Sequence, residues 1–583
     1  MANIKIEQVK PLHDFKRHHD FRELMKFCVE EYGDDDAFII KHKGPGRSKE
    51  VHYEHKTYRM LADDLNHFGT GLLNRGAKGK RVAIIANNCY EWMLPYYAVP
   101  CGLGIAVPLD KGLPFEEALS SIIRSNSEIL IFDPAHKKLV EELKQADMPV
   151  KQFYSTTPLE GYETVYDVIE EGRAILAGEK EGDQSFPELP IDPDDTALLL
   201  FTSGTSGLAK AVMLTQTNVL FNIWAMQVTQ PIRRGDINMA FLPYHHTFGC
   251  DTQVMMFSCG VTTVFCDGLK YIQKNMQEYH VTIFIGVPLL VEAIYKRVMR
   301  SVEKQGKMKT FQRGAQIGKF LNRFHIDVRR RLFKQIIDEL GGELRFIFCG
   351  ASALDPEAIR GFESIGVGVI QGYGMTESAP VITTETIREH RPGSIGKALY
   401  GVEVEIANPN EDGIGEIIAR SPSIMKGYYE DPEETAKTII DGWLHTGDLA
   451  RVNRDGYVFI AGRKKNVIVL KNGKNIYPEE IETLIASFPY VKENMVFAKE
   501  KRQEVNSELA LCAKIVYDPA VMKEQFDLED PKEIEAHIYA DIETINAGMP
   551  TYKQITRLIA TEEEMVKTTT GKVKRFVEEN KGE

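Results

Sequence analysis

Residues 200–210 read Leu200-Phe-Thr-Ser-Gly-Thr-Ser-Gly-Leu-Ala-Lys210, a polar loop between two apolar runs. The run from Thr196 to Phe201 is typical of a buried strand, and Ala-Val-Met-Leu at 211–214 predicts a second one. Glycines in such a loop let the backbone approach an anion, and consecutive N–H groups can surround it. A surface linker would need neither the flanking strands nor the closing lysine, so we interpret the loop as a phosphate-binding site.

The loop also supplies hydroxyl donors and a point charge suited to a phosphate group. It lacks the Gly-x-x-x-x-Gly-Lys-[Ser/Thr] order of a Walker loop. The expected phosphate-binding residues are Thr202, Ser203, Gly204, Thr205, Ser206, Gly207 and Lys210.

The composition indicates an ordinary soluble globular protein of two to four domains, since 583 residues exceed a single core. A formal net charge of −13 argues against general nucleic-acid binding. None of the eight cysteines forms a Cys-x-x-Cys pair, so neither a zinc site nor a disulfide framework is indicated. The N-terminus has no signal-peptide core, and no apolar run reaches the roughly 20 residues of a spanning helix. We expect a cytoplasmic protein, with peripheral membrane contact left open.

Strand and helix patterns alternate from Arg81 onward, which indicates a parallel sheet covered by helices. Strands are expected at 82–86, 105–108 and 129–132, with helices at 91–101 and 115–124 between them. The more polar stretch 135–195 is interpreted as a connector that leads into the phosphate loop. After residue 400 the alternation changes to period two, which predicts half-buried antiparallel strands.

Further motifs lie C-terminal to the loop. Small residues at Gly350, Ala351 and Ser352 follow a strand and would let a flat ring lie against the backbone. The string Val367-Gly-Val-Ile-Gln-Gly-Tyr-Gly-Met-Thr-Glu377 places an aromatic face between Gly372 and Gly374, which suits stacking on a purine. In the same string, the hydroxyl of Thr376 suits a phosphate, and the carboxylate of Glu377 suits magnesium.

Two strings near the C-terminus carry charged groups. Asp448 ends Gly442-Trp-Leu-His-Thr-Gly-Asp, and a carboxylate in such a loop is a natural partner for a ribose diol. Val566-Lys-Thr-Thr-Thr-Gly-Lys-Val-Lys-Arg575 is basic, and a basic tail is usually only solvated. The residues from 464 onward read as a small α+β domain.

Taken together, these strings resemble the adenylate-forming superfamily of acyl-CoA synthetases, luciferases and peptide-synthetase adenylation domains. The resemblance implies that His246 in Leu-Pro-x-x-His-x-x-Gly lines the carboxylate pocket and that Lys572 is the catalytic lysine. It further implies adenine contact by Tyr373, ribose contact by Arg463, a hinge at Lys465 and a pantetheine tunnel at Gly473. Acetate-activating relatives have tryptophan at the position of Gly374, so glycine here is interpreted as room for a longer acyl chain.

The resemblance is to AMP-forming acyl-CoA synthetases of the medium-to-long-chain fatty acid type, with ATP, Mg²⁺ and coenzyme A as cofactors. It implies an α/β fold with a large domain, 1–463, of layered, mostly parallel sheets plus a β-rich subdomain. A small mobile α+β domain, 464–583, would carry Lys572. The partners would be small molecules and no nucleic acid, with a homodimer left open. A carrier-protein acceptor, an aromatic acid, or a non-catalytic lipid-binding scaffold are the alternatives.

One segment has an unusual charge. Between Lys296 and Lys334 the chain has thirteen Lys or Arg residues and two acids. Apolar residues recur there at helical spacing, at Ile317, Leu321, Phe324, Val328, Leu332 and Ile336. An ordinary packed helix with a solvated basic face is the favoured interpretation. The alternative is a site for an anionic membrane or for the phosphates of coenzyme A.

Overall fold

The computed structural model describes residues 2–44, 50–202, 209–470, 474–500, 509–567 and 573–580. The chain forms two compact units. The larger unit comprises Lys5–Val404 and Ala419–Leu444, and the smaller unit comprises Met1–Ile4, Glu405–Ile418 and His445–Glu583. The expected division of the chain at 463/464 stays a prediction.

The first sheet of the larger unit contains the strands that flank the phosphate loop. β9 runs parallel to β5, and the parallel pairing continues through β4, β6, β7 and β8. β10 returns antiparallel along β9, and β20 pairs antiparallel with β10. In spatial order the strands are β20 Gly427–Tyr428, β10 Lys210–Thr215, β9 Thr196–Thr202, β5 Gly104–Pro108, β4 Lys80–Ile85, β6 Ile129–Phe132, β7 Gln152–Ser155 and β8 Glu163–Thr164.

The predicted strand–helix alternation is confirmed, but the interpretation of 135–195 as a connector is wrong. β7 and β8 extend the parallel sheet within that stretch, and a helix, α6 (Val165–Leu176), packs on α2 (Tyr58–Asn74). The stretch looks polar because its strands are short and lie at the edge of the sheet, where one flank meets solvent.

The second sheet of the larger unit is also mostly parallel. β2 and β11 to β15 run parallel, whereas β3, β16 and β17 pair antiparallel at its margins. In spatial order the strands are β17 Lys397–Ala398, β16 Val381–Thr384, β15 Gly368–Gly374, β14 Phe346–Cys349, β13 Ile283–Gly286, β11 Ile237–Ala240, β12 Thr262–Phe265, β2 Asp36–Lys43 and β3 Val51–Thr57.

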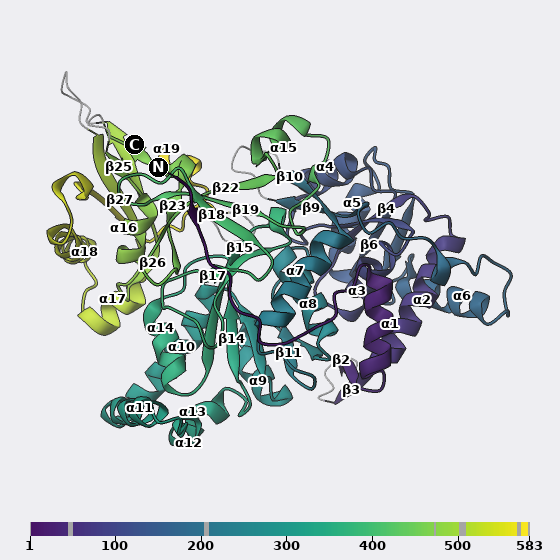
Figure 1. The fold of residues 1–583 in the computed structure, drawn as a ribbon, viewed down its shortest axis with the longest axis horizontal. Coiled ribbons are helices and arrows are strands. Elements are labelled where there is room, and N and C mark those ends of the chain that lie inside the picture. The colour runs from purple at the N-terminus through teal and green to yellow at the C-terminus, as the bar shows by residue number, and fades with distance from the viewer. Residues whose placement is uncertain are drawn as a thin grey trace. The chain divides into compact units, whose positions relative to one another are not determined.

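Helices cover the faces of both sheets in the larger unit, as Figure 1 shows. Apart from those already named and those of the segment 288–339, they are α1 Phe21–Tyr32, α3 Tyr90–Ala98, α4 Phe115–Ser125, α5 Lys137–Leu143, α7 Gln216–Thr229, α8 Thr247–Ser258, α9 Ile272–Tyr279, α14 Pro356–Ser364 and α15 Pro432–Thr438. The helices α6 and α7 begin with reciprocal capping boxes, formed by Thr164 with Asp167 in α6 and by Thr215 with Asn218 in α7. These caps fix where β8 and β10 pass into helix.

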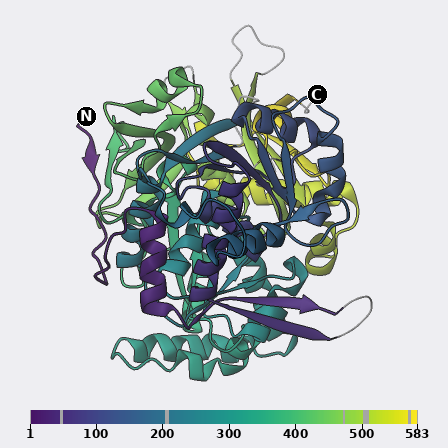
Figure 2. The same cartoon turned by 90° about the vertical axis from the view of Figure 1, so that its right-hand side faces the viewer.

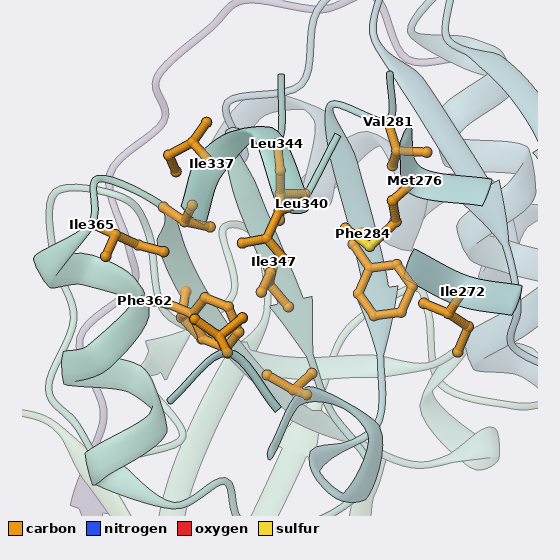
Figure 3. Close-up of a cluster of buried hydrophobic side chains, with 14 of the residues drawn as sticks. Ile272, Met276, Val281, Phe284, Ile337, Leu340, Leu344, Ile347, Phe362 and Ile365 are labelled. Atoms are coloured by element: carbon orange, nitrogen blue, oxygen red, sulfur yellow. The ribbon is translucent and has the colours of Figure 1, made fainter. Parts of the chain in front are cut away.

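One buried cluster holds the second sheet to its helices. Phe284 of β13 and Ile347 of β14 lie in it beside Met276 of α9 and Phe362 of α14. Figure 3 shows these side chains pointing toward one another from strands and helices. Burying apolar side chains of this size stabilises the fold by about 1.5–3 kcal/mol for each side chain.

The basic segment 296–334 is folded as several helices, which are α10 Pro288–Lys304, α11 Met308–Asn322, α12 Arg329–Leu332 and α13 Lys334–Glu339. In both views they lie along one margin of the larger unit (Figures 1 and 2). The favoured interpretation was an ordinary packed helix, whose periodic apolar side chains would be buried, and it is wrong for three of these residues. Ile317, Phe324 and Leu332 are 51%, 61% and 47% exposed.

The smaller unit combines antiparallel strands with an α+β region. β18 Glu403–Ala407, β19 Gly415–Arg420, β22 Trp443–Val452 and β23 Val458–Arg463 adjoin in one sheet. Its other elements are β24 Ile468–Val469, β25 Asn475–Ile476, α16 Pro478–Ile485, β26 Val491–Glu500, β27 Leu509–Tyr517, α17 Pro519–Phe526, α18 Pro531–Ala547, β28 Arg557–Thr561 and α19 Arg575–Asn580. Ile481, Ile515 and Ile538 belong to its buried core.

Among the described residues, no helix has both the length and the apolar character needed to cross a membrane.

A carboxyl group is buried between two helices of the larger unit. Asp251 of α8 is 2% exposed, and its Oδ1 accepts a hydrogen bond of 2.7 Å from the hydroxyl of Tyr96 on α3. Its Oδ2 has no hydrogen-bond partner in the described part of the chain. Burial raises the pKa of Asp251 to about 7, because the charged form loses its hydration.

This raised pKa predicts a pH dependence of stability. Below pH ~3 the carboxyl is largely neutral in both the folded and the unfolded chain, so folding has no ionisation cost there. As pH rises toward 7 only the unfolded chain ionises, and the free energy of unfolding falls by up to about 4 kcal/mol. We expect Asp251→Asn, which keeps the acceptor for Tyr96, to remove this fall. The melting temperatures of the wild-type protein and the Asp251→Asn variant, measured from pH 4 to pH 8, test this expectation. Melting temperatures that change with pH in the same way in both proteins would contradict it.

Candidate active site

The two strands beside the phosphate loop bring its ends together. In the antiparallel pairing of β9 and β10, Thr202 is the register partner of Lys210. The hydroxyl of Thr202 also donates to the carbonyl oxygen of Lys210, at 3.4 Å. The expected phosphate ligands Ser203, Gly204, Thr205, Ser206 and Gly207 lie outside the described residues. The described ends therefore put one hydroxyl and one ammonium group at the base of the loop.

Lys210 is positioned by residues more than 200 positions further along the chain. Its ammonium group forms an ion pair with Glu434 of α15 and lies 4.9 Å from the ring centroid of Tyr428. Tyr428 is on β20, which pairs with β10, so sheet register sets this contact. A cation over a tyrosine face is attracted by the ring's negative π surface.

Tyr428 also connects Lys210 to Glu377. Its hydroxyl donates a 2.8 Å hydrogen bond to Oε1 of Glu377, which is 7% exposed. The backbone N–H of Met425 donates to the carbonyl oxygen of Glu377, at 2.9 Å. Burial and the nearby Glu377 carboxylate raise the pKa of Tyr428 far above its usual value, so it stays a donor. Sequence reasoning missed Tyr428, and a tyrosine after Gly427 gave no signal of its own.

The N-terminus of α8 lies beside the same cluster. His246 is the N-cap residue of that helix, and the hydroxyl of Thr247 donates to Thr376 Oγ1 at 3.5 Å. The Nε2 atoms of His245 and His246 are 3.1 Å apart. Burial, together with His246, lowers the pKa of His245 to about 3. His245 is therefore neutral at pH 7 and adds no charge at the helix end where an anion is favoured.

The residues expected to face a purine follow two neighbouring strands. Gly350, Ala351 and Ser352 follow β14, and Gly372 to Gly374 end β15, its parallel neighbour. A Cβ at Gly350 would lie 3.1 Å from the ring of Phe248 on α8, so this turn packs against the same helix as Thr247. Ala351 has φ of 75°, a left-handed conformation that is uncommon outside glycine.

The structure explains the glycine at position 374 differently from the sequence analysis, which interpreted it as room for a longer acyl chain. A Cβ at this position would lie 1.8 Å from the carbonyl oxygen of Pro380. Close backbone approach therefore requires glycine here, and the residue by itself is no measure of room for a long acyl chain.

A small hollow lies between β11 and α8. Its walls are largely apolar, but Gln253 makes one end polar, because its amide accepts from Tyr244 at 3.3 Å and donates to Thr263 at 2.7 Å. The lining residues are Asn238, Met239, Ala240, Phe241, Leu242, Tyr244, Phe248, Gly249, Thr252, Gln253 and Ile285. The hollow adjoins the helix that His246 caps.

In the smaller unit, Asp448 and Arg463 form a pair. They are register partners in β22 and β23, and Nε of Arg463 donates to Oδ1 of Asp448 at 2.7 Å. The hinge candidate Lys465 is exposed in the short 3-10 helix Lys464–Asn466. The two predicted ribose contacts therefore sit side by side, ahead of the predicted hinge.

The segment that contains Lys572 is anchored on its C-terminal side. Lys572 itself and Gly473 lie outside the described residues. Arg575 forms an ion pair with the carboxylate of Glu482 on α16 and donates to the carbonyl oxygen of Val496, at 3.1 Å. Burial raises the pKa of Glu482 despite this arginine. Sequence reasoning missed this pair, because an arginine in a basic tail resembles a solvated one.

The structure thus brings Lys210, Thr376, Glu377 and His246 into one connected cluster in the larger unit, and the turn at Gly350 lies against the same helix. Asp448, Arg463 and Lys465 belong to the smaller unit. Within the described ranges, no group of three or more His, Cys, Asp or Glu side chains could hold a metal ion alone. Glu377 could supply one ligand to an ion that phosphate oxygens also bind.

Comparison with known proteins identifies the family. Residues 28–429 match the family described as AMP-binding enzyme, and residues 465–581 match the AMP-binding enzyme C-terminal domain. The chain belongs to the AMP-binding enzyme family, which confirms the resemblance to adenylate-forming enzymes and the mixed α/β fold.

Relatives within this family act on fatty acids according to their names. The chain is 24% identical over 553 residues to a chloroplastic long-chain-fatty-acid–[acyl-carrier-protein] ligase of Arabidopsis thaliana, covering 82% of this chain and 75% of that protein. It is 29% identical over 466 residues to long-chain-fatty-acid–CoA ligase 5 of Mus musculus, covering 74% and 67%. Its fold matches the anthranilate CoA ligase AuaEII in complex with anthranoyl-AMP, with a TM-score of 0.75, 20% identity and 98% of each chain covered.

The Arg575–Glu482 pair generates a prediction. Arg575→Met would leave a buried carboxylate without its cation, and we expect about 3 kcal/mol of destabilisation in the smaller unit. Hydrogen exchange measured by mass spectrometry should then rise at residues 566–567 and 573–580. Lys574→Met is the matched control, because Lys574 is exposed. The double variant Arg575→Met with Glu482→Met should regain most of the protection, and equal exchange in all variants would contradict the anchoring role.

Proposed function

We propose that the chain is an ATP-dependent acid–thiol ligase that activates a medium-to-long-chain fatty acid. A carboxylate oxygen would attack the α-phosphorus of ATP, giving an acyl-adenylate and pyrophosphate, and coenzyme A would then accept the acyl group. The observation that carries this proposal is the Lys210–Tyr428–Glu377 cluster beside Thr376 and His246. It would combine phosphate-binding and carboxylate-binding groups in a member of the AMP-binding family.

Each residue of the cluster has a role in the first half-reaction. Lys210 would exchange Glu434 for the leaving pyrophosphate, and Thr376 would hold the α-phosphate. Glu377, oriented by Tyr428, would ligate Mg²⁺, which neutralises phosphate charge when it is bound. His246 would line the carboxylate pocket. Little covalent help is needed, because the work is to hold the nucleophile in line with the phosphorus.

Residues outside this cluster, in both units, would supply the remaining groups. We propose that Asp448 and Arg463 bind the ribose diol and that Gly350, Ala351, Ser352 and Tyr373 contact the adenine. Residues 464–583 would form the mobile domain that carries Lys572 to the acyl and phosphate oxygens. After adenylation this domain would rotate about Lys465 and bring Gly473 to the thiol channel, a hinge movement with general precedent.

The acyl acceptor has one specific alternative. The Arabidopsis relative is named as a ligase to acyl-carrier protein, whereas the mouse relative is named as a CoA ligase. Both acceptors present the same phosphopantetheine thiol, so the adenylation site would be unchanged. AMP release that depends on CoA favours the free cofactor.

The proposal also extends to location. We propose that the protein contacts membranes peripherally through the basic segment 296–334, since long-chain acids partition into bilayers.

The substrate is tested by pyrophosphate release from ATP and Mg²⁺ with acetate, octanoate, palmitate and coumarate, each with and without CoA. We expect the rate to peak with octanoate or palmitate and turnover to require CoA. Release that is independent of CoA would favour a carrier-protein acceptor. A peak with coumarate would replace the fatty acid by an aromatic acid, and no release with any acid would overturn the proposed activity.

The role of Lys572 is tested separately for each half-reaction. Lys572→Ala should slow adenylation by at least about 10²-fold, the size of losing one preorganised donor. Thioester formation from supplied acyl-adenylate should be spared, because the lysine would have been withdrawn by then. Rapid-quench measurement of both steps decides the matter. Equal losses in both steps would count against the domain rotation.

A further inference from the structure

An apolar surface projects from α11 and the turn that follows it. Phe320 and Phe324 are 58% and 61% exposed, and their ring centroids are 5.3 Å apart. We define the α11 outer face by the exposed apolar side chains of α11 and of the turn that follows it, which are Ile317, Phe320, Phe324 and Ile326. Single exposed apolar residues are ordinary, but two exposed aromatic rings in contact, with further exposed apolar residues on the same helix and turn, are typical of an interaction site.

The opposite side of α11 already packs against the core. Phe311 lies 5.0 Å from the ring of Phe333, and a Cβ at Gly314 would lie 2.9 Å from that ring. A Cβ at Gly318 would lie 2.8 Å from the side chain of Arg329. At 100° per residue, positions 317 and 320 lie on the side away from this contact. The α11 outer face is therefore a second apolar stripe that the fold does not use.

Cations without carboxylate partners surround this stripe. Side chains of Lys309, Arg313, Lys319, Arg323 and Arg331 are exposed, and none has an acidic group within 4.0 Å in the described part of the chain. The whole chain has a formal charge of −13, so this positive region is local. Positive side chains around exposed aromatic and aliphatic groups match an interfacial amphipathic helix.

Two arginines of the basic segment serve a different purpose. Arg329 donates to Asp327 at 2.9 Å and to the carbonyl oxygen of Glu363 at 2.8 Å. Arg330 donates to the carbonyl oxygens of Gly342, at 2.8 Å, and Leu344. These groups hold the segment to the body of the larger unit. Reversing their charge would disturb the fold and would be a poor test of surface binding.

We propose that the α11 outer face docks on a lipid bilayer that contains anionic headgroups. Phe320 and Phe324 would enter the boundary between headgroups and acyl chains, and the surrounding cations would contact the phosphates. A second protein copy fits less well, because a symmetric contact would bring the cations of one copy against the same cations of the other, with no carboxylate to pair them. The inference rests on the proposed function, because it assigns the membrane contact proposed for the segment 296–334 to one face of α11, and a membrane-dissolved acid gives that docking a purpose.

The test is cosedimentation of the full chain with phosphatidylcholine vesicles, with and without phosphatidylglycerol. We expect binding to the anionic vesicles and its loss with added salt. Phe320→Ser with Phe324→Ser, and separately Arg313→Glu with Arg323→Glu, should each lower the vesicle partition coefficient by about 10-fold or more. Leu289→Ser is the matched apolar control, since Leu289 is 78% exposed in α10. Lys138→Glu with Lys151→Glu is the charge control, since both lysines are exposed.

Several outcomes would overturn the docking. Wild-type protein that stays in the supernatant, or binding that both pairs of substitutions leave unchanged, excludes this face. If the wild-type protein is a dimer without lipid and the variant with both Phe320→Ser and Phe324→Ser is a monomer, the face belongs to a contact with a second copy. Pyrophosphate release with octanoate in solution should be the same in all variants. Its absence from the wild-type protein would instead overturn the proposed activity, so the two failures are distinguishable.

Discussion

The hydrogen bond from Tyr428 to Glu377 links the parts of the larger unit on which the candidate site depends. β20 carries Tyr428 alongside β10, whose first residue is Lys210. The tyrosine face therefore meets the ammonium group while its hydroxyl fixes a buried carboxylate. A buried carboxylate is costly without donors, so this hydrogen bond both stabilises Glu377 and sets its orientation. One ring thus contacts both predicted ligands, the ammonium group at its face and the carboxylate at its hydroxyl.

The sequence predicted the parts of this site whose signals are local. The strands on either side of the phosphate loop, the strand before Gly350 and the strand that ends at Gly374 follow from apolar runs interrupted by small residues. Tyr428, Glu434 and His245 could not be predicted, because tertiary pairing defines their roles. Glu434 is 224 positions from Lys210, and Glu482 is 93 from Arg575. Pattern reasoning has no access to such distances.

The basic segment shows a different limit of sequence reasoning. Helical periodicity at Ile317 and Phe324 indicated a helix. The helix α11 contains Ile317 but ends at Asn322, before Phe324. Periodicity does not say which apolar stripe faces inward when a helix has two. Here Gly314 and Gly318 permit close packing on the inner side, so the large side chains are on the outer one. The positions of these two glycines indicate which side of α11 packs inward, and the composition of the segment does not.

The positioning contacts of the candidate site are local to one unit or the other. Lys210, Tyr428, Glu377 and Glu434 all belong to the larger unit. Asp448 with Arg463, and Glu482 with Arg575, all belong to the smaller one. Any movement of one unit past the other would therefore leave each of these contacts intact. That arrangement suits the proposed two-step reaction, because the side chains of each unit can stay rigidly placed throughout it.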